Sequence, residues 1–574
     1  MVVYGATSNR TPYLTANTLD QALLDQCSGD LSNQIELVAE IQAPDGSWIY
    51  VSDRNKYVGG TFYEARVEFP VIERTIGDWL SPEVEFSELE ITVSNADGKY
   101  NNFLPQGADY VPWINNQVII KVGLRDVVST FFSIFSGKVT HVAGFNRNTS
   151  SFTLKARDRF DELNESIPNK VFADEWSDAE DDKEGEFIPI VLGDWTTNLS
   201  DPAQVPATVT NGADPDTISG VGPVVMHVSD NTQDLIENNT VYLLRGSEWT
   251  LVPVANVSIN SNKYIIMTQG WTLPDSTAYL YSSSDRFYCR CRTFPPLGLS
   301  TVYINPVTIA IHLLREYGGL DIDNEMDRPT WEYYALKGNP AQSEILEYKA
   351  RAWIGSSQSI IGYVKSLLQQ CRLEPVFKNN GKITVKSFHF EEWTTPYNNA
   401  SEILIYDIEK DSFVPRMSEI NNFNKTQIAY DTNPRTGETV YKTNLFQNAA
   451  SIAVAGKDIT KFVIMPNAIL DPLSIDYVSL HGQELLKLAS GFFEEIELNV
   501  TWRFLFLEPG DMVRLNVEID SSKYTNVPCV VRTIAYDPDG MKLRLKLWSL
   551  QMINFPGYEP GYSGMVGGYN QTIT

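Results

Sequence analysis

The pattern of apolar and polar positions is clearest between residues 351 and 390. From Ser359 to Cys371, apolar side chains recur at helical spacing with polar residues between them, which predicts an amphipathic helix with one apolar face. After Pro375 the period changes to two, and Asn380-Gly381 separates two β-prone runs. An Asn-Gly pair favours the type I′ turn of a hairpin because both residues tolerate positive φ. The segment is therefore predicted to be a helix followed by a β-hairpin.

Most of the remaining pattern is typical of short strands. Between residues 34 and 172, six or more β-prone runs are separated by turn residues, which predicts a barrel or a sandwich. Residues 200–285 show shorter alternations of the same kind and predict a small second all-β module. A further helix is predicted from Pro306 to Tyr317, after Asn305. Strands then predominate as far as Leu550.

The composition agrees with a globular, β-rich chain. Its 574 residues suffice for about three to five domains, and 43% of them are hydrophobic. Aromatic residues are plentiful, with 28 Tyr, 26 Phe and 12 Trp, as is common in strands. No apolar run approaches the ~20 residues of a membrane span, and the first thirty residues lack the basic and apolar regions of a signal peptide. We therefore expect neither a signal peptide nor a membrane span.

The net charge limits the partners that the chain can grip. Acidic residues outnumber basic ones 72 to 45, which gives a formal charge of −27. Tight binding of nucleic acid or anionic lipid normally needs a basic face, so both are disfavoured. An acidic wall does suit a conduit through which DNA slides, because like charges keep the polyanion from sticking. Solubility is the alternative reason for such a charge.

Several motifs together resemble the hub proteins of bacteriophage tails and related injection machines. The helix and hairpin of residues 359–388 are followed by Pro509-Gly510-Asp511 and then by two β-prone runs, in the order found in that family. Phe135-Ser136-Gly137-Lys138-Val139, with Leu154 to Asp158 after it, resembles the strand pair that ends the N-terminal barrel of tail proteins. Residues 187–195 resemble a segment that such proteins place between domains. The resemblance implies a mainly β, multi-domain fold with α+β parts, built from tail-tube-like β-barrels and a helix-hairpin domain.

The resemblance also implies a function and a set of partners. Such a hub is a structural, non-enzymatic protein that forms a homotrimeric ring at the distal end of the tail. The ring joins the tail tube or a distal tail protein to a tail fibre or spike, and surrounds the path of the tape-measure protein and the DNA. The protein would be assembled in the host cytoplasm and reside in the virion, with no catalytic, cofactor-binding or metal-binding residues.

The resemblance and the pattern together suggest a division of the chain into seven parts. They are an N-terminal arm (1–33), a β-barrel hub domain (34–172), an acidic linker and connecting segment (173–199), a small β module (200–299), an α+β helix-hairpin domain (300–400), a C-terminal β-rich hub domain (401–550) and a Gly/Tyr-rich tail (551–574). The tail carries one charge, Glu559, and cannot fold alone, so we expect it to order against a neighbour.

A few residue groups have the composition of metal or nucleotide sites. The five cysteines are odd in number and scattered, and of these only Cys289 and Cys291 lie close enough to suggest a metal pair. Two strand cysteines that point in one direction are the alternative. The acidic run 174–186 and the segment 321–327 lack the regular spacing or the turn glycine of a calcium loop. Gly137-Lys138 lacks the flanking residues of a P-loop.

Signals of catalysis are weak. No nucleophile-elbow, zinc-protease or dinucleotide fingerprint is present, and the five histidines (141, 227, 312, 389 and 481) have no partner pattern. A Ser–His–Asp triad stays open because its members need not be close in sequence. His312, in the predicted helix, is expected to be structural or exposed and not catalytic. Two other functions remain as alternatives: a receptor- or carbohydrate-binding baseplate component with an aromatic site in 200–285, and an enzyme that degrades cell-wall polysaccharide.

Overall fold

A computed structural model describes most of the chain. The described residues are 35–77, 87–104, 112–125, 127–146, 150–176, 185–196, 203–211, 222–229, 235–260, 264–282, 284–293, 305–337, 349–387, 401–417, 423–469, 477–489, 494–505, 507–519, 522–538, 542–549 and 571–572. The N-terminal arm and most of the C-terminal tail fall outside these ranges. Within them, no helix is both long and apolar enough to cross a bilayer.

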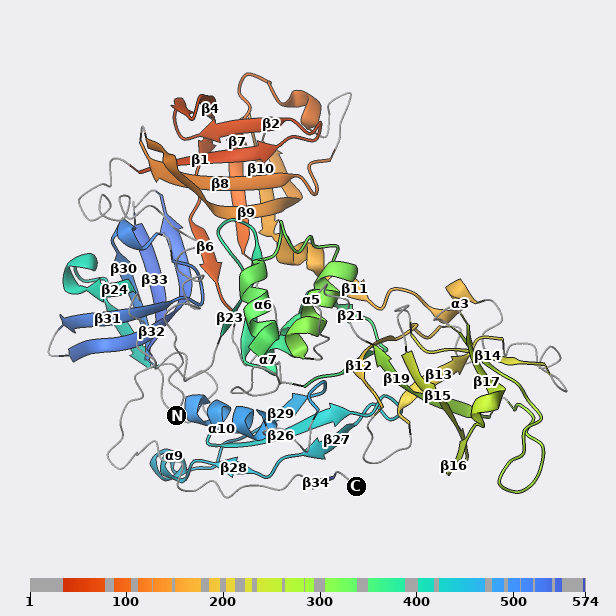
Figure 1. Cartoon of the computed structure of the whole chain (residues 1–574). Coiled ribbons are helices and arrows are strands. Elements are labelled where there is room, and N and C mark those ends of the chain that lie inside the picture. Colours follow the sequence, from red (N-terminus) through yellow and green to blue (C-terminus); the bar gives the residue numbers. More distant parts are fainter. Residues whose placement is uncertain are drawn as a thin grey trace.

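The first part of the chain forms a nine-stranded sheet (Figure 1). Its strands, in sheet order, are β3 (Lys56–Val58), β4 (Thr61–Ala65), β2 (Trp48–Ser52), β1 (Ile35–Gln42), β8 (Gln117–Leu124), β9 (Val127–Asn146), β10 (Ser151–Asp158), β7 (Glu88–Ser94) and β5 (Val67–Glu68). Side chains alternate between a buried and an exposed face, as in β7, where Leu89, Ile91 and Val93 point inward. This alternation is the signal from which the barrel or sandwich was predicted.

The two ends of this sheet meet at Arg66. β4 is the second strand from one end of the strand order and β5 is the last strand at the other, yet only Arg66 separates them in sequence. The backbone N–H of Arg66 donates to the carbonyl of Ser52 at 2.9 Å, and its carbonyl accepts from the N–H of Ser94 at 2.7 Å. One short segment therefore pairs with both ends, and the sheet curves into a barrel. We call it the first barrel.

The end of the chain forms a second sheet of the same kind. Its order is β24 (Ser401–Leu404), β31 (Met512–Ile519), β32 (Ser522–Asp537), β33 (Lys542–Ser549), β30 (Glu494–Val500) and β25 (Val414–Met417). β24 and β25 again lie at opposite ends, joined through η5 (Ile405–Asp407). Between them, the N–H of Glu409 donates to Asn499 and the N–H of Thr501 to Asp407, each at 2.9 Å. We call this sheet, closed in the same way, the second barrel.

The closing segments of the two barrels also run in the same directions relative to the strands that they pair with. In the first barrel the closing segment runs parallel to β2 and then antiparallel to β7. In the second, it runs parallel to β31 and then antiparallel to β30. One device therefore closes both barrels.

A strand from the N-terminal part of the chain joins the two barrels. β6 (Ile72–Thr75) leaves the first barrel and pairs with β32, so that Thr75 lies opposite Thr533 and Ile72 opposite Tyr536. One continuous cluster of buried apolar side chains extends across both sheets. Burial of this shared surface favours a fixed arrangement of the two barrels.

The predicted helix and hairpin are confirmed in the middle of the chain. α7 (Ile360–Gln369) is capped by Ser359, and β22 (Leu373–Phe377) pairs with β23 (Ile383–Ser387) around Gly381, whose φ is 78°. The second predicted helix is α5 (Pro306–Glu316), where Asn305 accepts a capping hydrogen bond from Thr308 N–H at 2.8 Å. α6 (Arg328–Lys337) was not predicted, because its aromatic residues show no helical period.

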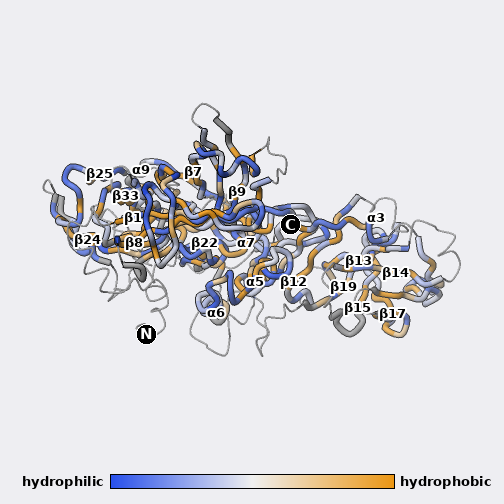
Figure 2. Tube along the Cα trace, turned by 90° about the horizontal axis from the view of Figure 1, so that it is seen from above, coloured by the Kyte–Doolittle hydropathy of each residue, from blue (hydrophilic) through white to orange (hydrophobic). Residues whose placement is uncertain are grey.

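A seven-strand path forms the small β module at one end of the molecule (Figure 2). Its order is β16 (Glu248–Leu251), β15 (Leu235–Arg245), β19 (Arg286–Thr293), β13 (Val205–Val209), β14 (Val224–His227), β18 (Tyr264–Met267) and β17 (Val257–Asn260). It has a separate apolar core. β12 (Ile190–Asp194) pairs with both β19 and β20 (Ala352–Ile354), and so connects the module to the helix-hairpin part. The remaining short elements of this half are η1 (Asn101–Phe103), η2 (Arg159–Asn164), β11 (Ser166–Ile167), α3 (Phe172–Glu175), η3 (Val254–Asn256) and β21 (Gln358–Ser359).

A further sheet is formed by strands between β25 and β30 in sequence, together with β34 near the end of the chain. It contains β28 (Phe446–Gln447), β26 (Lys425–Thr432), β27 (Thr439–Lys442), β29 (Thr460–Met465) and β34 (Gln571–Thr572), with α9 (Ala449–Ala455) and α10 (Tyr477–Ala489) beside it. We call it the five-stranded sheet. Strands β26 and β27 form an antiparallel hairpin, in which Thr432 lies opposite Thr439. β30 (Glu494–Val500) ends at Val500, and η6 (Trp502–Phe504) follows it with Phe504 buried.

The described residues are therefore mainly strand, with α+β parts, as the sequence predicts. Figure 2 shows the second barrel at one end, the helix-hairpin part in the middle and the small module at the other end.

Candidate functional site

The two motifs that carry the sequence resemblance contact each other. Lys386 on β23 places its Nζ 2.7 Å from Asp511 Oδ1 and 3.6 Å from Glu508 Oε2. The backbone N–H of Asn379, at the hairpin turn, donates to Glu508 Oε1 at 2.9 Å. All four side chains are buried or nearly so. The helix-hairpin part and the second barrel thus meet through charges removed from water.

Gly510 permits this approach. Its φ is 86°, a left-handed value that favours glycine, and its N–H donates to Val531 at 2.7 Å. A Cβ atom at this position would lie 2.7 Å from Lys386 Cγ. The turn therefore requires glycine both for its backbone conformation and for its contact with the lysine.

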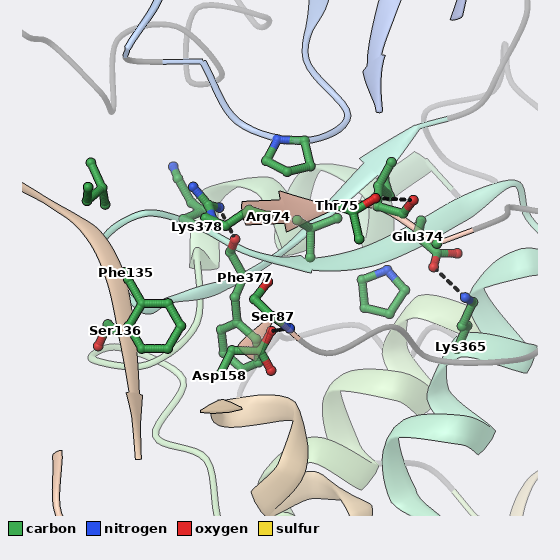
Figure 3. A pocket seen from close by; sticks show the side chains of 16 residues that line it. Arg74, Thr75, Ser87, Phe135, Ser136, Asp158, Lys365, Glu374, Phe377 and Lys378 are labelled. Carbon is green, nitrogen blue, oxygen red and sulfur yellow. Dashed lines mark hydrogen bonds and ion pairs between the residues drawn. The ribbon is translucent and has the colours of Figure 1, made fainter. Parts of the chain in front are cut away.

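The first barrel reaches the same junction through β6. Arg74 Nη2 donates to the carbonyl of Phe377 on β22 at 2.7 Å. Nearby, Lys378 Nζ lies 3.2 Å from Asp327 Oδ2, and Lys365 Nζ lies 2.8 Å from Glu374 Oε1. These contacts place strand β6, the hairpin and the Pro-Gly-Asp turn around one point (Figure 3).

A small cavity lies at the centre of this junction. Its volume is about 30 Å³, and Arg74, Phe135, Asp158, Phe377 and Pro509 are among its lining residues (Figure 3). A water needs roughly 10–15 Å³ measured in this way, so the cavity has room for one or two waters. It is far smaller than a typical ligand pocket. The cavity is therefore a small gap within a packed junction between segments of the chain.

The electrostatics of the junction follow from burial and from the central lysine. Burial acts to raise the pKa of Glu508, but Lys386 and, beyond it, Arg74 and Lys378 hold that pKa below its ordinary value. For Asp511, burial outweighs Lys386 and raises the pKa. Burial acts to lower the pKa of Lys386, and the two carboxylates outweigh it, so this pKa is raised. The lysine thus stays charged, and its charge stabilises the carboxylates beside it.

A second buried ion pair connects three other parts of the chain. Arg351 contacts Asp431 of the five-stranded sheet with an Nη2–Oδ1 distance of 2.7 Å, and its Nη2 donates to Gln204 of the small module at 2.8 Å. The guanidinium also lies 4.1 Å from the ring centre of Trp195. Burial raises the pKa of Asp431, although Arg351 acts in the opposite direction.

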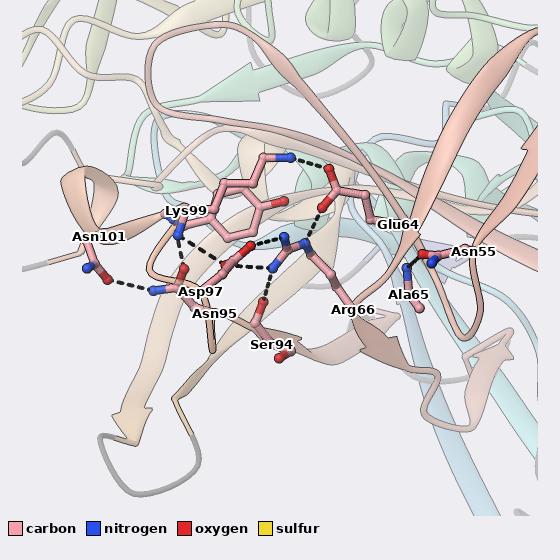
Figure 4. Close-up of polar contacts among 10 residues, drawn as sticks. Asn55, Glu64, Ala65, Arg66, Ser94, Asn95, Asp97, Lys99 and Asn101 are labelled. Atoms are coloured by element: carbon pink, nitrogen blue, oxygen red, sulfur yellow. Dashed lines mark hydrogen bonds and ion pairs between the residues drawn. The ribbon is translucent and has the colours of Figure 1, made fainter.

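The point of barrel closure is held by an ion network. Figure 4 shows the Arg66 guanidinium between Glu64 and Asp97, with Lys99 also on Glu64. Arg66 Nη1 lies 3.0 Å from Asp97 Oδ1 and donates to Ser94 O at 3.3 Å. Hydrogen bonds from Arg66 hold the pKa of Asp97 well below its usual range. The side chain of Arg66 therefore supports the joint that its backbone makes.

The residues singled out from the sequence occupy structural positions. Cys289 and Cys291 are both buried on β19 within the core of the small module, in the arrangement of two strand cysteines that point in one direction. Asp321 caps the N–H groups of Asp323 and Asn324, and Asp323 pairs with Arg328. The acidic run 174–186 lies largely outside the described ranges. Among the described side chains, none form a group of three or more metal-binding residues placed to hold an ion.

His312 is buried on α5, and burial lowers its pKa to about 4. Lys365, one of the polar residues between the apolar positions of the predicted helix, is buried, and only 1% of its side chain is exposed. The hairpin covers that side of α7, and Glu374 supplies the counter-charge. The alternation of side chains along β23 indicates that Lys386 and Thr384 lie on the same face. It gives no sign that the partner of Lys386 is Asp511, in a turn 125 residues away.

The fold is similar to solved structures of tail proteins. A tail protein from Neisseria meningitidis matches at 8% identity and a TM-score of 0.41, over 90% of this chain and 97% of that one. The 43 kDa tail protein of prophage MuSo2 from Shewanella oneidensis matches at 9% identity and a TM-score of 0.39, over the same shares. The prophage tail protein gp18 from Listeria monocytogenes matches at 11% identity and a TM-score of 0.24, over 64% of this chain and 95% of that one.

All three matched structures are tail proteins. No protein-family model matches the chain, and neither does any curated protein sequence. Because each TM-score is below 0.5, we base the functional proposal on the geometry of this chain.

Proposed function

We propose that this protein is the structural hub of a phage or phage-like tail, located in the virion at the distal end of the tail tube. Three copies form a ring that joins the tail tube or a distal tail protein to a tail fibre or spike. The ring surrounds the path of the tape-measure protein and the DNA. The role is structural and not enzymatic, and assembly takes place in the host cytoplasm.

The proposal rests mainly on the two barrels, which are closed by the same arrangement of strand pairings. Arg66 joins the ends of the first sheet, and residues 401–417 join the ends of the second with the same parallel and antiparallel pairings. A chain with two similar barrels supplies two similar building blocks to a ring. Three copies would therefore arrange six barrels around one axis.

The junction between the barrels supports this role. A hub bears load from the tube on one side and the fibre on the other, so its parts must keep their relative positions. Strand β6 pairs with β32 across the two barrels, and the ion pairs of Lys386 fix the hairpin against the second barrel. The charged groups of the junction contact one another, as expected of a structural contact between domains and not of a catalytic site.

The charge agrees with passage of DNA without specific binding. A formal charge of −27 per copy repels a polyanion and keeps it from adhering to the ring. The same charge argues against a tail component that grips DNA.

Light scattering of the purified chain tests the proposal. We expect a mass near three times 64.6 kDa, and rings with a central opening in negative-stain micrographs. A strict monomer that also fails to form rings on purified tail tubes would contradict the hub. Glycan-array binding by the chain would instead favour a receptor-binding component, and clearing of host cell walls in a zymogram would favour an enzyme.

A further inference from the structure

The last described strand, β34, belongs to a sheet whose other strands all precede β30 in the sequence. β33 ends at Ser549 in the second barrel, whereas β34 pairs with β27 in the five-stranded sheet, with Gln571 opposite Lys442. Residues 550–570 connect the two strands. An extended connection of that length reaches at most roughly 70 Å. The terminal strand can therefore reach sheets well beyond its own barrel.

Among the described residues, two large apolar side chains on one face of the five-stranded sheet are exposed. Phe462 lies opposite Gln427 and Ile464 opposite Ala429, so these side chains share one face with Lys442. Phe462 is 70% exposed and Ile464 67% exposed, whereas the other face packs against α10 through Val463, Leu485 and Leu486. Figure 1 shows α10 on one side of the sheet. Two large apolar side chains on one exposed face mark an interaction surface.

The pairing of β34 within one chain does not cover this face. With β34 in place on β27, Phe462 and Ile464 keep the exposure given above. β26 separates β27 from β29, so a neighbouring copy that docks at β27 and extends over the sheet would reach the two residues across one strand. The hydrogen bonds of β34 are the same whether β27 belongs to its own chain or to a neighbour, so exchange of such an element costs little.

The composition of the connecting segment agrees with this arrangement. Residues 550–570 are rich in Gly, Tyr and Pro and carry a single charge, Glu559. Such a segment lacks the means to build a core of its own, but its Tyr, Met and Phe side chains match an apolar surface. In addition, β34 is the strand that covers the β27 edge, and uncovered edges tend to recruit strands from other chains.

We propose that β34 is exchanged between copies. In the assembled ring, Gln571–Thr572 of one copy pairs with β27 of a second copy, and that copy covers the face formed by Phe462 and Ile464. This inference rests on the proposed ring and goes further, since it names the surface and the segment that connect two neighbours.

Site-directed cross-linking of the full chain tests the exchange. Two versions with different affinity tags, Lys442→Cys and Gln571→Cys, are co-expressed in a Cys27→Ser background. Cys289, Cys291, Cys371 and Cys529 are buried and remain as they are. We expect a short bis-maleimide to link the two versions to each other, with the 442–571 peptide identified by mass spectrometry. A chain carrying both substitutions should form covalent oligomers.

Links confined to a single chain would overturn the exchange. If light scattering still gave a trimer, the ring would stand without exchange of β34; a monomer would count against the ring as well. A second variant, Phe462→Ser with Ile464→Ser, should weaken association at least tenfold, with Lys155→Ser on the first barrel as the exposed control. Unchanged association of the double variant would also contradict the proposal.

Discussion

Lys386 in the hairpin and Asp511 in the Pro-Gly-Asp turn form an ion pair of 2.7 Å across 125 residues of sequence. Each residue belongs to a motif that is common in unrelated β proteins. Their contact joins the helix-hairpin part to the second barrel, and Arg74 brings the strand from the first barrel to the same place. The relationship makes the junction the most direct target for mutation.

Removal of the central lysine should destabilise the junction strongly. Lys386→Met leaves Glu508 and Asp511 buried without their counter-charge, and breaking a buried pair in this way costs about 3–5 kcal/mol. Hydrogen exchange of the β32 amides measures the local loss. Lys155→Met is the control, because its pair with Glu90 is exposed and worth roughly 1 kcal/mol or less. Equal effects of the two substitutions would show that the junction does not depend on this charge.

A methyl group on the Pro-Gly-Asp turn should disturb the same contact. Gly510→Ala introduces a Cβ atom 2.7 Å from Lys386 Cγ at a positive φ, so both a clash and backbone strain are expected. Gly437→Ala is the matched control, with a φ of 72° and nothing within 4 Å of the added carbon. The control should cost about 1 kcal/mol, and Gly510→Ala clearly more. Thermal unfolding of both variants measures the difference, and equal melting temperatures would exclude the clash.

The pair of Arg351 and Asp431 should show a pH-dependent loss when the arginine is removed. Arg351→Leu leaves a buried carboxyl group whose pKa burial already raises, so the folded state holds its proton to a higher pH than the unfolded state. Stability of the variant relative to wild type should therefore fall as the pH rises from about 4 through the folded pKa. Urea unfolding between pH 4.5 and 8 checks this. Adding Asp431→Asn should remove the pH dependence; a difference that persists would assign it to another group.

His312 should contribute to instability in acid. Its folded pKa of about 4 lies below the ordinary value of 6.5, because burial disfavours the charged ring. The unfolded chain binds the proton first, so stability is lost as the pH falls from 6.5 towards 4, by up to roughly 3 kcal/mol. His312→Leu should lose less stability than wild type between pH 7 and pH 4.5. An identical pH profile for the two proteins would show that the ring is hydrated in the folded state.

The sequence alone predicted those helices and hairpins that depend on residues close together in the chain. α7 and its hairpin were predictable because a 3.6-residue period, the Ser359 cap and the Asn-Gly turn act within a few residues of one another. The capped start of α5 was predictable for the same reason. The mainly β class followed from the alternation of the strands. α6 escaped prediction because its burial comes from tertiary packing and leaves no period in its sequence.

Contacts between distant segments had no such local signal. Strand patterning shows which face of a strand is apolar, but not which strand lies beside it, so the pairing of β6 with β32 and both barrel closures could not be read from the chain. The junction charges depend on the same pairings. The sequence places Lys365 in an amphipathic helix and Lys386 in a strand, and only the packed structure supplies the buried carboxylates that hold them. Burial of a charge is decided by its partner, and here the partners of Lys386 and Arg351 come from distant parts of the sequence.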